Sequence, residues 1–148
     1  MRPVADGVIV PGERISGIRV GMAMRDAIAV AGGAWVRVKD PMGADVYLWP
    51  HRAVRIRPIR DGVASVGALS APETMRAGVT YATASGWGPG STTAEIRSAL
   101  GDPPDRRQQG PIERWTYPSC GVAVGVDGES RLQIVEVFAA TQISRRCR

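Results

Sequence analysis

The chain has 148 residues, of which 44% are apolar, with one histidine, two cysteines and a formal net charge of +5. No run approaches the roughly 20 apolar residues that a helix needs to cross a membrane, which excludes a helical membrane protein. One histidine cannot support a histidine-rich metal centre, and two cysteines cannot close a zinc site without several carboxylates. The composition therefore predicts a soluble chain that binds no metal and no other cofactor.

The first predicted helix lies between Gly21 and the pair Gly32-Gly33. Its apolar residues recur at helical spacing, at Met24, Ala27, Ile28 and Ala31. Short apolar runs separated by turn residues then predict four strands, at 34–38, 45–49, 53–59 and 63–69. Asp61-Gly62 is typical of a two-residue hairpin turn between the last two.

The same order returns in the second half of the chain, because the helix motif repeats at an offset of 69 residues. Thr92 and Glu95 predict a capping box, and Gly101 closes the second helix. Strands are predicted at 113–117, 121–126 and 131–138. The segment 101–111 contains three prolines and several charges, and is predicted to be a loop.

Each half thus predicts a short helical segment on a three- to four-stranded antiparallel sheet. The expected fold class is α+β, with a first repeat at 1–70, a linker at 71–78 and a second repeat at 79–148. One helix covers only one face of such a sheet. The two exposed faces would then combine into one broad surface.

The glycine-rich stretch before the second helix, residues 86–102, has the composition of a phosphate-binding loop. It lacks the lysine of a Walker loop, since the single lysine of the chain is Lys39, and Gly86 and Gly88 do not continue into a dinucleotide-binding fingerprint. We therefore expect an architectural role for these glycines.

No residue pattern in the sequence gives a positive reason to predict an enzyme. A dyad of Cys120 with His51 is the one conceivable nucleophilic site, but no feature near the cysteine would lower the pKa of its thiol. In an exported protein Cys120 and Cys147 would form one disulfide, which contributes roughly 3 to 4 kcal/mol to stability. In a cytosolic protein they would be free thiols.

Basic residues concentrate at 51–60, with Arg52, Arg55 and Arg57 among them. Val54 and Ile56 alternate with two of these arginines, which is typical of a strand with one buried and one solvated face. The alternative is a stripe that binds nucleic acid or another polyanion. Asparagine is absent and nearly all the basic residues are arginine, so part of this charge reflects codon bias.

Aromatic residues are the other feature of the predicted strands. Tyr47 and Trp49 are two residues apart, as are Trp115 and Tyr117, so each pair projects from one sheet face. Large aromatic residues dominate protein interfaces, which makes these four candidate partner anchors. They serve equally well as the core between sheet and helix.

The first helix motif, 15–32, and its second copy, 90–101, resemble a sequence signature shared by two families. These are the tandem-repeat β-lactamase inhibitor proteins and the single-repeat SmpA/OmlA outer-membrane lipoprotein domain. The resemblance implies a helical segment over a four-stranded sheet in each half, and an extracytoplasmic protein that binds another protein. The inhibitors present an acidic residue beside a tyrosine, which Asp45 and Tyr47 resemble in composition.

The sequence therefore favours a non-enzymatic, periplasmic or secreted protein-binding module that presents a sheet face to a protein partner. Asp45, Tyr47, Trp49, Trp115 and Tyr117 are its candidate contact residues. The given N-terminus has acidic residues and Pro11 where an export signal would be apolar, so no such signal is expected in it. The alternative function is arginine-mediated binding of nucleic acid or another polyanion.

Overall fold

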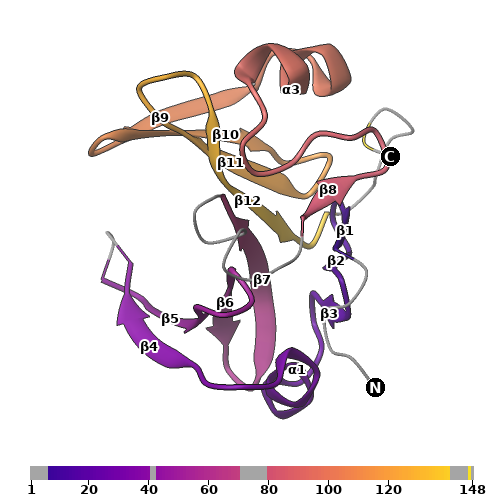
Figure 1. Cartoon of the computed structure of the whole chain (residues 1–148), viewed down its shortest axis with the longest axis vertical. Helices are drawn as coiled ribbons and strands as arrows, with labels where there is room; N and C mark the ends of the chain where they lie inside the picture. The colour runs from indigo at the N-terminus through magenta and orange to yellow at the C-terminus, as the bar shows by residue number, and fades with distance from the viewer. Residues whose placement is uncertain (1–6, 41–42, 71–79, 141–146, 148) are drawn as a thin grey trace.

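The computed structural model describes residues 7–40, 43–70, 80–140 and 147. This part of the chain forms an eight-stranded antiparallel sheet, a four-stranded sheet and two eight-residue helices (Figure 1). The predicted α+β class is therefore wrong, because strand residues greatly outnumber helical residues in the described structure and the helices are short. The predicted linker, 71–78, lies outside the described residues.

The large sheet consists of two four-stranded meanders joined at its centre. The first contains β4 (Val36–Lys39), β5 (Asp45–Trp49), β6 (Val54–Ile59) and β7 (Gly62–Leu69). The second contains β9 (Asp105–Gln109), β10 (Ile112–Tyr117), β11 (Val122–Val126) and β12 (Leu132–Phe138). The order β4-β5-β6-β7-β12-β11-β10-β9 makes β7 and β12 neighbours and leaves β4 and β9 as the edges (Figure 1).

Each meander is preceded by a helix, α1 (Met24–Ala31) or α3 (Thr93–Leu100). The capping box predicted for the second is confirmed: the Glu95 amide donates to Thr92 Oγ1, and Glu95 Oε1 accepts from the Thr92 amide, both at 3.3 Å. α1 begins after Ala23, which has no side chain to cap it. Both helices end at the expected glycines, Gly32 and Gly101, which have positive φ.

A small sheet that the sequence did not predict links the two halves. It contains β1 (Val8–Val10), β2 (Arg14–Ile15), β3 (Ile18–Arg19) and β8 (Ala82–Thr83), in the order β3-β2-β1-β8. Strands of two or three residues are too short to show a period-2 pattern. Because β1 pairs in parallel with β8, the start of the chain is attached to the start of the second half.

Two local predictions are wrong. The loop predicted at 101–111 contains β9, which fits between its prolines and pairs with β10 from Asp105 to Gln109. The hairpin turn predicted at Asp61-Gly62 is shifted by one residue, because Gly62 already pairs with Ile59. Arg60 therefore occupies the turn and takes the positive φ of 53° that a glycine would adopt more easily.

The glycine-rich stretch before α3 is part of the folded framework. A Cβ on Gly88 would lie 2.3 Å from the carbonyl oxygen of Tyr81, so only glycine fits against that backbone. The Gly88 amide donates to Ser91 Oγ at 2.9 Å, and the Gly90 amide donates to the Leu132 carbonyl at 2.7 Å. These contacts give the glycines the architectural role expected of them.

The side chains of the large sheet divide between a core face and an open face. The helices and the small sheet share one hydrophobic core with the core face, whose residues include Trp49, Val54, Ile56, Val66, Ala68, Trp115, Tyr117, Val122, Val124, Val135 and Val137. The open face carries the alternate residues, including Val36, Val38, Val46, Leu48, Arg55, Arg57, Ser65, Gly67, Arg107, Arg114, Thr116, Ala123, Gly125, Ile134 and Glu136. The described helices and the small sheet pack on the core face and not on the open face.

Candidate functional site

Three of the four predicted aromatic anchors are core residues. Trp49, Trp115 and Tyr117 are 0%, 2% and 3% exposed, on the face that α1 and α3 cover. The Tyr117 hydroxyl donates to the carbonyl of Gly101 at the end of α3, and burial raises the pKa of Tyr117 to about 12. Because the protein's own residues surround these three side chains, the prediction that they contact a partner is corrected.

Trp115 is also held by charged neighbours. Its Nε1 donates to Glu113 at 2.6 Å, and the guanidinium groups of Arg97 and Arg106 lie 4.8 and 4.9 Å from the centre of its ring. The hydrogen bond from Trp115, with that from Arg106, lowers the pKa of the Glu113 carboxyl. These residues line a pocket of about 370 Å³ beside α3, in which Arg106 pairs with Glu113 while Arg97 pairs with Asp102 outside the lining.

Tyr47 and Asp45 lie near the β4 edge rather than on the open face. The Tyr47 ring is half-buried and stacks on Trp35, with centroids 4.8 Å apart and planes at 8°. Asp45 accepts from Lys39 at 2.8 Å, and that hydrogen bond lowers the pKa of its carboxyl. Both side chains face the core side of the sheet, so they do not share a surface with the open face.

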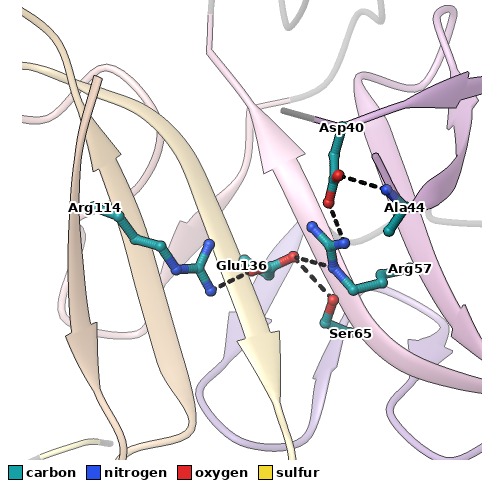
Figure 2. Close-up of polar contacts among 6 residues, drawn as sticks. All are labelled: Asp40, Ala44, Arg57, Ser65, Arg114 and Glu136. Carbon is teal, nitrogen blue, oxygen red and sulfur yellow. Dashed lines mark hydrogen bonds and ion pairs between the residues drawn. The ribbon is translucent and has the colours of Figure 1, made fainter. Parts of the chain in front are cut away.

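The centre of the open face is a buried carboxylate, which the sequence prediction missed. Glu136 of β12 is 3% exposed and accepts from Arg114 Nη2 at 2.8 Å and from Ser65 Oγ at 2.9 Å (Figure 2). Arg57 Nε lies 3.9 Å from the same carboxylate, and Arg57 also donates to Asp40. Figure 2 shows Arg114 on one side of Glu136 and Arg57 with Asp40 on the other. The network therefore ties the second meander to the first.

Arg55 completes the positive surroundings of Glu136. It lies across Gly67 from Glu136 in the strand register, and burial lowers the pKa of its guanidinium against the opposing effect of Glu136. Gly67 leaves room for its neighbours, because a Cβ there would lie 2.9 Å from Ile134 Cδ1 and 3.4 Å from Arg55 Cγ. For Glu136 itself, burial raises the carboxyl pKa, but the attraction of Arg114 and the hydrogen bonds outweigh it, and the pKa is lowered.

The three arginines predicted as a polyanion stripe do not form one. Arg52 lies in the turn before β6, where its Nε donates to the Ala31 carbonyl at 3.1 Å. Arg55 is largely buried, and Arg57 is paired with Asp40 and Glu136. Their charges are therefore directed at groups of the protein, and a phosphate would have to compete with those partners.

The cysteines are joined to each other. Cys120 and Cys147 form a disulfide, as predicted for an exported chain, with Cα atoms 5.3 Å apart. A bonded Cys120 has no thiol to act with His51, so the dyad is ruled out in this state. Among the described residues, no three histidine, cysteine or acidic side chains gather closely enough to bind a metal ion. No helix in the described ranges has the length and apolar character to span a membrane.

Comparisons of the chain with protein-family profiles, with curated proteins and with solved structures find no match. The resemblance of the helix motifs to inhibitor proteins and outer-membrane lipoproteins therefore stays a prediction.

Substitution of the tryptophans should separate core from surface. Trp49→Ala removes a fully buried ring and should lower the free energy of unfolding by about 3 to 5 kcal/mol. Trp35→Ala removes a ring that is 39% exposed, stacked on the neighbouring Tyr47, and should cost only about 1 kcal/mol. Urea unfolding followed by circular dichroism measures both. Equal costs for the two variants would contradict the assignment of Trp49 to the core.

Removal of the Glu136 charge should weaken the junction between the meanders. Glu136→Gln leaves the arginines around it without their carboxylate and should lower the free energy of unfolding at pH 7 by about 3 kcal/mol. Glu129→Gln, at an exposed turn, is the control and should stay within about 0.5 kcal/mol of wild type.

The same variant has a predicted pH signature. A carboxyl whose pKa is lowered by folding stabilises the protein above its unfolded pKa of about 4.3, and this contribution is lost as pH falls through the folded pKa. Wild type should therefore lose stability below about pH 4 more steeply than Glu136→Gln does. Parallel acid limbs for the two proteins would show that folding does not lower the pKa of Glu136.

Proposed function

We propose that this chain is a non-enzymatic protein-binding module whose contact surface is the open face of the eight-stranded sheet. The observation that carries the proposal is that the face on which neither described helix packs combines half-exposed apolar side chains with arginines that are already held in place. Such a mixture, with charged groups confined to ordered positions, is what protein interfaces use. The similarity of the helix motifs to inhibitor proteins also supports protein binding as the class of function.

The fixed charges favour binding for an entropic reason. Arg57 and Arg114 are each about 30% exposed on their side chains, and Glu136 holds both. A partner that covers them does not have to immobilise two long side chains, which otherwise costs about 0.5 to 1.5 kcal/mol for each. Because these polar atoms are directed at Glu136 and Ser65 rather than at a cleft, we assign them a binding role and no catalytic one.

A negative charge added to the open face should weaken the binding of a partner protein. Leu48→Glu and Thr116→Glu each add one carboxylate to this face, one in each meander, at half-buried positions. Gln108→Glu adds the same charge to β9 on the opposite side of the sheet and is the matched control. We expect at least one open-face variant to lose about tenfold or more in affinity for proteins captured by wild type from cell-envelope extract, with Gln108→Glu unchanged.

Capture that both open-face variants retain would contradict this proposal, and loss of capture by Gln108→Glu alone would place the contact on the other side of the sheet. Capture of nucleic acid instead, with an affinity that falls steeply as salt rises, would support the polyanion alternative, because each phosphate contact releases counterions. Circular dichroism melts of the three variants establish that they are folded.

We further propose that the protein works outside the cytoplasm, in the periplasm or as a secreted protein. The Cys120–Cys147 disulfide supports this, since such bonds persist in oxidising compartments. Denatured protein from its native source should show no mass gain on alkylation, and two alkyl groups after reduction. Reduction should also lower the free energy of unfolding by roughly 3 to 4 kcal/mol. Two thiols that react before reduction would count against this localisation.

A further inference from the structure

The two edges of the large sheet differ in chemistry. β4 is exposed along its whole length, and Val36 and Val38 are 48% and 37% exposed. β9, at the other edge, contains no apolar residue from Asp105 to Gln109. Among the described strands, none pairs with the outer side of β4. An exposed edge with apolar side chains is a template for an added strand, and charged residues along an edge discourage it.

The strand that already pairs with β4 shows which side chains it accepts. In the antiparallel register, Val36 lies opposite Leu48 and Val38 lies opposite Val46. Lys39 lies opposite Asp45 and its Nζ is 2.8 Å from the carboxylate. Aliphatic residues thus face the valines, and an acidic residue faces a cation.

The cations of β4 are not neutralised by this partner. Arg37 and Lys39 are 63% and 68% exposed, and both pair with the same carboxylate, Asp45, at 3.9 and 2.8 Å. Two cations and one anion leave one positive charge at the edge. This charge is available to an acidic residue on the outer side.

Charge and register together disfavour pairing of β4 with a second copy of this chain. In an antiparallel pair of two β4 strands, residues directly opposite each other lie on the same face of the sheet. The two-fold axis that relates the two copies must therefore pass through a residue of β4 and not between two residues. An axis at Arg37 places this residue opposite its own copy, and an axis at Val38 places Arg37 opposite Lys39. Like charges directly opposite each other destabilise a strand pair. An axis at Val36 brings no two cations together, but it places Lys39 opposite Gly33, which lies outside the strand. In this register only Val36 pairs within β4.

We propose that β4 binds an extended segment of another protein by antiparallel strand addition, with acidic residues opposite Arg37 and Lys39 and aliphatic residues opposite Val36 and Val38. Backbone hydrogen bonds supply affinity in such a complex, and alternate side chains supply specificity. This surface is the β4 edge rather than the open face: Val36 and Val38 belong to the open face, but the charges that select the segment, Arg37 and Lys39, project to the other side of the sheet. It therefore goes beyond the proposed function.

The test uses capped six-residue peptides and the full chain. The probe is acetyl-Thr-Asp-Val-Glu-Leu-Thr-amide, and the control carries Lys in place of Asp and Glu. Binding is followed by amide chemical shifts and by hydrogen exchange at β4. The acidic peptide should bind at least about tenfold more tightly than the lysine peptide, and the variant Arg37→Glu with Lys39→Glu should reverse that preference. Arg37→Gln with Lys39→Gln should bind both peptides equally, and it keeps the test valid if the first variant does not fold.

Two N-methylated forms of the acidic peptide test the strand geometry. Amides of successive residues point to opposite edges of a strand. One form carries methyl groups on the amide nitrogens of Asp and Glu, and the other carries them on the amide nitrogens of Val and Leu. Only the form whose methylated amides face β4 should lose binding. Binding of both forms, equal binding of the acidic and lysine peptides to wild type, no binding of the probe, or a dimer that Arg37→Glu with Lys39→Glu dissociates would each overturn the proposal. Because none of these variants changes the open face, failure here is distinct from failure of the proposed function.

Discussion

The pairing of β7 with β12 is the contact on which the rest of the structure depends. Each meander alone would have an edge here, and a four-stranded sheet covered on one face by a single short helix buries little. Pairing from Ser65 to Leu69 with Ile134 to Phe138 removes both edges and merges the two halves into one core. Glu136 strengthens the junction, because its carboxylate is bound by Ser65 from the first half and Arg114 from the second.

This junction also explains the character of the open face. A buried carboxylate is stable only when it is surrounded by donors, so the strands beside it carry Arg55, Arg57 and Arg114. Gly67 and Gly125 leave room above the sheet for Ile134, which packs between them. The residues that stabilise the junction are therefore the residues that a partner on this face would meet. Stability and recognition would be properties of one network.

The fold was partly predictable from local patterns. The two helices, the capping box of Thr92 with Glu95 and seven strands of the large sheet follow from periodicity and turn residues. β9 was missed because its residues, Asp105 to Gln109, are all polar, and an edge strand needs no apolar side chain. The small sheet was missed because its strands are held by tertiary pairing rather than by their own sequence. With these elements included, the balance shifts from α+β to mostly β.

The candidate site was less predictable, because burial depends on pairing across the sheet. Tryptophan and tyrosine two residues apart indicate one sheet face, but not which face the helices cover. For Trp115 and Tyr117 the answer is set by α3, and Trp49 belongs to the core that the helices and the small sheet share with the large sheet. The partners of Glu136 could not be read locally, since Ser65 and Arg114 are 71 and 22 residues away in sequence. A carboxylate in the middle of the apolar run Leu132–Phe138 was the one available clue.

The net charge of +5 is a poor guide to function in this chain, because much of it is used inside the fold. Arg52 binds a carbonyl, Arg57 and Arg114 bind Glu136, and Arg106 binds Glu113. A cation attracts an acidic partner most strongly where the carboxylates around it do not balance its charge. At Glu136 the acidic group is buried and surrounded, whereas at Asp45 one exposed carboxylate serves two exposed cations. The β4 edge is therefore where an acidic partner gains most, although it contributes only two of the chain's basic residues.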